Sequence, residues 1–269
     1  MALNRLFIFT TICLFTILNS AFGVETILFE ENFDGLKLGP SMKERIIQEG
    51  VWTNTPPKGW SIENVLAAPG MPEWDGWAFA NDEWWTLTAE DQERSKFSGG
   101  KAVNTIAIAD PDEWDDLNDP DSKGTFNSWL STPPIKISGV SANSITLTFD
   151  SSLRPEAPQV NELYVSFDGG TRIVLIRMEA SGENNLYKEP LNKVEILKPD
   201  KEDVNVSIKI NVPNPTGAKE AVFTWAVIEA KNNWWWAIDN ISVTTTSVVS
   251  AVDSSGKLST LWGKIKAGK

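Results

Sequence analysis

The chain has 269 residues, no histidine, one cysteine and a formal net charge of −12. The absence of histidine excludes Ser-His-Asp and Cys-His catalysis and removes the commonest zinc and iron ligand. The excess of acid disfavours nucleic acid and anionic membranes as partners, because both call for basic patches. It suits an extracellular protein that uses calcium, although an acidic surface also serves plain solubility.

Residues 1–23 have the pattern of a secretory signal peptide. Arg5 precedes an apolar run over residues 6–18, and in the segment 21–23 (Ala-Phe-Gly) Ala21 and Gly23 are small residues at the spacing that a signal peptidase reads. The run is too short for a comfortable membrane span. We therefore expect cleavage after Gly23, a secreted or cell-surface protein, and no transmembrane segment in the mature chain. Because Cys13 lies in the run, the mature chain has no disulfide and depends on its core.

Tryptophan is unusually frequent, with thirteen residues against two tyrosines. The most aromatic segment, residues 71–97, is either a long ordered loop or a satellite core fixed by its tryptophans. In the first case its indoles are exposed and stack on sugar rings. The ligand-binding residues would then be Trp74, Trp77, Asn81, Asp82, Trp84, Trp85 and Arg154.

An acidic run follows at residues 110–121. Seven of its twelve residues are Asp or Glu, and their spacing does not match an EF-hand loop. The run is therefore either a solvated loop or a metal site built from oxygen ligands alone.

From residue 128 onward the pattern is that of β-strands. Hydrophobic residues alternate over 144–150, 163–167 and 204–212, and Asp168-Gly169-Gly170 is typical of a hairpin turn. The segments 221–230 and 234–243, joined at Lys231–Asn233, predict a hairpin that closes the domain. Many short strands without helical periodicity predict an all-β fold, an antiparallel β-sandwich or jelly roll. We expect one domain over residues 24–245, with a long Trp-rich loop region.

The last strand carries apolar side chains on both faces. Side chains alternate, so Trp235 and Asp239 share one face while Trp234 and Trp236 share the other. The strand should therefore lie centrally, covered on both sides. A carboxylate buried there requires a cation or backbone N–H groups to compensate its charge.

Residues 246–269 form a linker and a basic tail. Four apolar residues of the tail recur at helical spacing, which is typical of a docking peptide but also of a frayed terminus. They are Leu258, Leu261, Trp262 and Ile265.

Three motifs resemble those of MAM-like and cleaved-adhesin-like (choice-of-anchor-type) jelly-roll modules of secreted bacterial proteins. They are the segments 29–35 (FEENFDG), 163–170 (LYVSFDGG) and 236–243 (WAIDNISV). Segments 76–81 and 109–116 are similar to accessory modules found beside secreted phosphoesterases. The resemblance implies a β-sandwich whose first and last strands share a structural calcium ion. The implied ligands are Glu31, Asp34 and Asp239, with Asp150 as a further candidate. The alternative is that Glu31 and Asp34 cap a turn while Asp239 accepts backbone hydrogen bonds.

Two classes of function follow from these features. The first is a non-catalytic binding or adhesion module for carbohydrate, another extracellular polymer or a surface protein. The second is a hydrolase with paired carboxylates, for which Glu83, Asp112 and Glu156 are candidates. A purely structural surface or matrix component is a third hypothesis, which the sequence does not separate from the first.

Overall fold

The computed structural model describes residues 23–181, 184–199 and 203–248. Residues 25–247 cluster into one compact unit, built largely from β-strands. The expected signal peptide, apart from Gly23, and nearly all of the expected linker and tail lie outside the described residues. No helix in the described part is long and apolar enough to cross a membrane.

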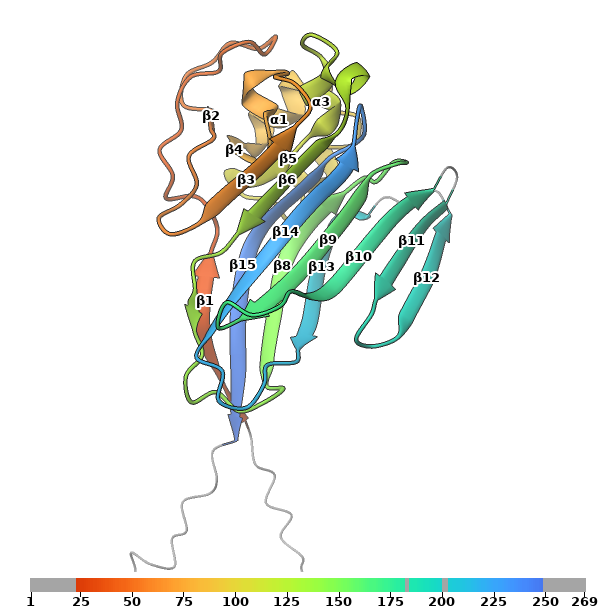
Figure 1. Cartoon of the computed structure of the whole chain (residues 1–269). Coiled ribbons are helices and arrows are strands. Elements are labelled where there is room, and N and C mark those ends of the chain that lie inside the picture. Colours follow the sequence, from red (N-terminus) through yellow and green to blue (C-terminus); the bar gives the residue numbers. More distant parts are fainter. Residues whose placement is uncertain (1–22, 182–183, 200–202, 249–269) are drawn as a thin grey trace, which may run out of the picture. The chain divides into compact units, whose positions relative to one another are not determined.

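Two antiparallel sheets make up the unit (Figure 1). The seven-stranded sheet has the order β13-β8-β15-β5-β4-β2, with β1 also paired to β15. Its strands are β1 (Gly23–Glu31), β2 (Trp52–Thr53), β4 (Ala78–Asn81), β5 (Thr105–Ala109), β8 (Ile145–Leu153), β13 (Asp203–Val212) and β15 (Trp236–Val248).

The eight-stranded sheet has the order β12-β11-β10-β9-β14-β6-β3, with β7 also paired to β14. Its strands are β3 (Ser61–Leu66), β6 (Phe126–Ser131), β7 (Ile135–Lys136), β9 (Val160–Phe167), β10 (Ile173–Ser181), β11 (Asn184–Glu189), β12 (Val194–Pro199) and β14 (Glu220–Ala230). The predicted antiparallel β-sandwich is therefore confirmed.

The Trp-rich segment is not one long loop. It contains β4 and the helices α1 (Asp82–Thr88) and α2 (Ser95–Ser98), and the acidic run that follows begins with α3 (Pro111–Asp115). Asn81 caps α1, because its side-chain oxygen accepts a hydrogen bond from the Trp84 N–H. Two short 3-10 turns complete the segment, at Pro72–Trp74 and Pro120–Lys123.

The last strand is central, as its two apolar faces predict. β15 lies between β8 and β5, and Ala237, Ile238 and Asp239 have no exposed surface. The indole N–H of Trp235 donates to Ser152 and that of Trp236 to Ser151, at 2.9 and 3.0 Å. Adjacent tryptophans thus use adjacent serines of β8 on opposite faces of the sheet.

The predicted closing hairpin is wrong. β14 and β15 belong to different sheets, so residues 231–235 carry the chain from one sheet to the other. Both segments have strand patterns and a turn between them, but each strand pairs with strands that are distant in the sequence. β14 pairs with β9 and β6, while β15 pairs with β8 and β5.

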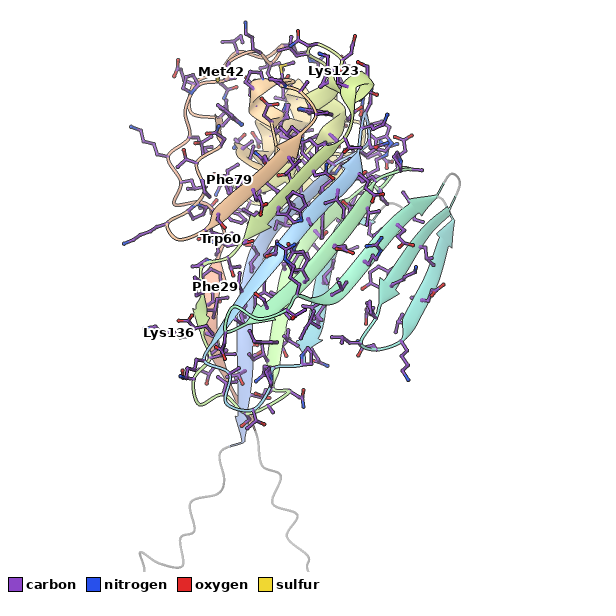
Figure 2. All side chains as sticks on the ribbon, viewed as in Figure 1. Phe29, Met42, Trp60, Phe79, Lys123 and Lys136 are labelled. Atoms are coloured by element: carbon purple, nitrogen blue, oxygen red, sulfur yellow. The ribbon has the colours of Figure 1, made fainter. Side chains whose placement is uncertain are left out.

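Aromatic side chains join the two sheets. Trp225 of β14 stacks on Trp60 at 6.2 Å between ring centroids and meets Phe149 of β8 edge-on at 5.5 Å. Phe33 extends this cluster to Trp60 and Phe79, at 5.4 and 5.2 Å. Figure 2 marks Trp60 and Phe79 on the side of the unit that carries β1 and β3. The core is therefore packed through rings rather than held by disulfides.

Replacing Trp225 by Ala should destabilise the fold by about 3–5 kcal/mol, because it removes a buried ring at the centre of this cluster. Urea unfolding followed by circular dichroism measures the loss. Trp234→Ala is a matched control, since that ring is only partly buried, and it should cost clearly less. An equal cost in both variants would contradict the packing described here.

Candidate functional site

The four tryptophans expected to stack on a ligand are buried. Trp74, Trp77, Trp84 and Trp85 are each at most 1% exposed. Trp74 and Trp84 stack on each other at 5.9 Å, and the Trp84 indole donates to the carbonyl of Ile46 at 2.9 Å. The expectation of an exposed platform in residues 71–97 is therefore wrong, and the satellite core is what forms. The sequence signal, a high density of aromatic residues, does not distinguish the two.

The polar residues expected beside that platform have structural roles. Asn81 caps α1, and Asp82 in the first turn of that helix is 4% exposed. Burial raises the pKa of Asp82 above its ordinary value. The guanidinium of Arg154 lies 3.8 Å from the ring centre of Trp234, and its Nη1 donates to the carbonyl of Gln92 at 2.7 Å. Asn81, Asp82 and Arg154 therefore do not line an exposed aromatic surface.

Arg94 organises the acidic run. Its buried guanidinium lies 3.0 Å from carboxylate oxygens of both Asp110 and Glu113, and 3.5 Å from Asp112. It also lies 4.3 Å from the ring centre of Trp235. These three acids are the ones in the described chain whose ligand atoms fall within 4.8 Å of one another. Because a cationic side chain already lies among them, we assign the cluster to an internal ion network rather than to a metal site.

The predicted hydrolase residues lie on three different segments of the fold. Glu83 and Glu156 are exposed, on α1 and in the loop after β8. Burial, followed by the charge of Asp110, raises the pKa of Asp112 to about 6. In the described chain, Glu83, Asp112 and Glu156 do not form a cluster within 4.8 Å.

The predicted calcium ligands lie near β1 and the β8–β15 pair. Glu31 accepts from the Phe33 N–H at 2.8 Å, and Asp34 accepts from the Thr105 N–H at 3.1 Å. Asp150 and Asp239 are opposite each other on β8 and β15. The oxygens of these four residues are not within 4.8 Å of one another as a set in the described chain. As arranged, they do not surround one point.

Asp239 is nevertheless an unusual carboxylate. It has no exposed surface, and it accepts hydrogen bonds from the N–H groups of Val103 and Asn240 at 3.0 and 2.7 Å. Burial, together with smaller contributions from the charges of Asp34 and Asp150, raises its pKa to about 7, although the two hydrogen bonds act in the opposite direction. Asp239 itself does not line the polar cavity of about 410 Å³ between the end of β1 and the following residues of β15, which is lined in part by Glu31, Asn32 and Asn240. Carboxylate and amide oxygens near such a cavity suit a hard cation.

The side chain that the sequence interpretation missed is Trp129. Along β6, Phe126, Ser128 and Leu130 are buried while Asn127, Trp129 and Ser131 are partly exposed. Trp129 thus lies on the polar, outward face of the eight-stranded sheet. In Figure 1 this face is turned to the viewer, with no described helix or strand in front of β6, β14 and β9.

Trp129 differs from the other tryptophans of the described chain. Ten of these are buried, and Trp234 is covered by Arg154. No ring or cation of the described part stacks on Trp129. Its neighbour Ala226 points outward yet has no exposed surface. The methyl side chain of Ala226 is short, so flanking side chains must cover it. The indole of Trp129 is the largest of these side chains.

Polar residues occupy several positions next to Trp129 on the outward face of the sheet. Ser131 and Thr224 share a hydrogen bond at 2.8 Å between their hydroxyl oxygens. One cross-strand row of outward residues passes through the indole and runs from β3 to β12. Its members are Glu63, Trp129, Ala226, Glu162, Arg177, Lys188 and Glu195. Neighbouring strands lie about 4.8 Å apart, so the row spans roughly 29 Å. A single aromatic ring within a polar row is suited to an extended ligand that has both C–H and hydroxyl surfaces.

The sequence did contain a signal for this residue. Residues 126–131 (FNSWLS) alternate, with a tryptophan on the same face as an asparagine and a serine. A large ring on the polar face of an amphipathic strand is less readily explained by core packing than a ring in an aromatic cluster.

No protein-family model and no curated protein matches the sequence. Among solved structures, the chain is similar to the K1 cleaved adhesin domain of Lys-gingipain from Porphyromonas gingivalis W83. The TM-score is 0.46 at 12% identity, covering 84% of this chain and 100% of that one. The module TmCBM61, solved with β-1,4-galactotriose, gives 0.36 at 14% identity, covering 70% and 89%. The enzymatically active domain of bacteriophage CBA120 tailspike protein 4 gives 0.37 at 10% identity, covering 71% and 20%.

These similar structures include the cleaved adhesin group that the sequence resembles. They do not bear on the likeness to MAM modules or to modules beside phosphoesterases. At TM-scores below 0.5 the comparisons carry no argument about function. The β-sandwich itself stands on the strand pairing described above.

The stability of the metal-free protein should fall as pH rises from about 4 to about 7. Asp239 keeps its proton in the folded state up to about pH 7, whereas the unfolded chain releases it near pH 4. The slope for one proton reaches at most about 1.4 kcal/mol per pH unit. Asp239→Asn should remove this part of the slope in urea titrations done in EDTA. An unchanged slope in the variant would show that Asp239 titrates normally.

Proposed function

We propose that this chain is a secreted, non-catalytic carbohydrate-binding module whose ligand lies on the outward face of the eight-stranded sheet. Trp129 is the stacking platform. The observation that carries the proposal is an indole that is partly exposed, without a ring or cation on it, on a polar sheet face that no other described element covers. The N-terminal pattern of residues 1–23 supports secretion, and the dispersal of Glu83, Asp112 and Glu156 supports a non-catalytic role.

The geometry suits a sugar chain for a physical reason. A pyranose presents C–H groups on one face, which pack against the electron-rich face of an indole, while its hydroxyls point sideways. Around Trp129, the hydroxyl of Ser131 on β6 and the carboxylate of Glu63 on β3 are placed to meet them. Binding modules of this kind work with few polar contacts on a preformed surface.

Trp129→Ala should abolish binding to neutral polysaccharides without unfolding the protein. Affinity electrophoresis in gels containing galactan, galactomannan or β-glucan measures retardation, and circular dichroism measures folding. Trp234→Ala is the matched control, because it removes another partly buried indole that already carries Arg154. Retardation that survives in Trp129→Ala but not in Trp234→Ala would place the ligand elsewhere. No retardation of the unaltered protein would leave a structural or protein-binding role.

A structural calcium ion is a second part of the proposal. Burial, and after it the charges of Asp34 and Asp150, raise the pKa of Asp239, and a cation near the three carboxylates would relieve the repulsion between them. Glu31, on β1 beside the polar cavity, would complete the set after a modest side-chain movement. The ion would hold the first strand to the last and would have no role in chemistry.

Calcium should raise the melting temperature, and EDTA should lower it. At a hundredfold excess over its dissociation constant, a bound ion contributes about 2.7 kcal/mol, which corresponds to roughly 5–10 °C for a domain of this size. Asp239→Ala should remove the response. Asp112→Ala should keep it, since that acid belongs to the Arg94 network. Melting curves that are identical in calcium and EDTA would refute the ion.

A further inference from the structure

Trp129 has an acidic neighbour whose charge is not compensated within the described chain. Glu63 lies directly opposite it on β3 and is exposed. Directly opposite side chains on neighbouring strands have Cβ atoms about 5 Å apart. The described residues offer no ion pair to Glu63. A ligand stacked on the indole therefore lies beside a free carboxylate.

The cations on the other side of the row are already paired. Glu162 lies beyond Ala226, and Arg177 forms an ion pair with it. Arg177 also contacts Glu179 at 2.5 Å, and Lys188 contacts the same carboxylate at 2.9 Å. These two cations are consequently not free to receive an anion from a ligand on Trp129.

Arg172 is the other cation near this face, and it is farther from the indole. Its guanidinium lies 4.5 Å from the ring centre of Tyr164. Tyr164 is two strands from Trp129 and two residues along, a separation of about 12 Å. The pKa of Tyr164 is raised, first by burial, and Glu162 and Glu63 raise it while Arg172 lowers it.

We infer that this surface selects uncharged polysaccharides, with Glu63 as the residue that rejects chains bearing carboxylate or sulfate groups. The inference rests on the proposed function, since it concerns the same platform at Trp129. A carboxylate on a sugar stacked there would lie within about 5–8 Å of Glu63, inside the screening length at physiological salt. Like charges juxtaposed in this way oppose binding and thereby set specificity.

The test compares polymers that differ in charge alone. Galactan, galactomannan and β-glucan are used as neutral chains and again after oxidation of their C6 hydroxyls to carboxylates. Affinity electrophoresis of the purified protein and of Glu63→Gln is run at low and at high salt. Glu83→Gln is the charge-matched control, because it removes one exposed carboxylate from α1, in the part of the chain that follows β4.

The unaltered protein should prefer the neutral polymer by more than tenfold. Glu63→Gln should reduce the ratio of the affinities for neutral and oxidised polymer about three- to tenfold, equivalent to roughly 0.6–1.4 kcal/mol. High salt should reduce this ratio as well. Equal binding of neutral and oxidised chains, still dependent on Trp129, would overturn the selection and leave the proposed function standing. An equal effect of Glu83→Gln would also overturn it, by showing a response to net charge alone. Failure of every neutral polymer to bind would remove the proposed function and this inference together.

Discussion

Burying many tryptophans is the constraint on which the rest of this structure depends. Ten of the twelve indoles in the described part of the chain are buried, and each brings an N–H group that is costly to leave without an acceptor. Ser151 and Ser152 serve the two indoles at the start of β15, and carbonyls at residues 46 and 73 serve two others. Carboxylates serve the indoles of Trp85 and Trp74, whereas the buried indole N–H groups of Trp77 and Trp225 have no hydrogen-bond partner among the described residues.

The buried acids in turn require a buried cation. Asp110 accepts from the Trp85 indole at 2.9 Å and from Arg94, while Glu44 accepts from the indole of Trp74. Arg94 forms ion pairs with the acids at the start of the acidic run and packs its guanidinium on Trp235. An acidic loop that resembles a metal site in the sequence is therefore an internal network in the structure. Removing either partner alone would leave an uncompensated buried charge.

The fold class could be predicted from the sequence because the alternation of apolar and polar residues along a strand is a local property. It predicted the sandwich, and it predicted a central β15 with both faces covered. Which strands share a sheet is a long-range property, so β14 and β15 were joined into a hairpin that does not form. Whether an aromatic cluster faces the core or the solvent also depends on long-range contacts. For this reason Trp74 and Trp84 were expected at a ligand and lie in the core, while Trp129 on the polar face of β6 passed unnoticed.

The most direct test of the central claim is oxidative footprinting of tryptophan side chains by mass spectrometry, with and without a neutral polysaccharide. The buried indoles of Trp74, Trp77, Trp84 and Trp85 should react slowly in both conditions. Trp129 should be oxidised readily in the free protein and protected when the polysaccharide is added. Rapid oxidation of the 74–85 indoles with protection there, and no change at Trp129, would contradict both the core and the binding face described here.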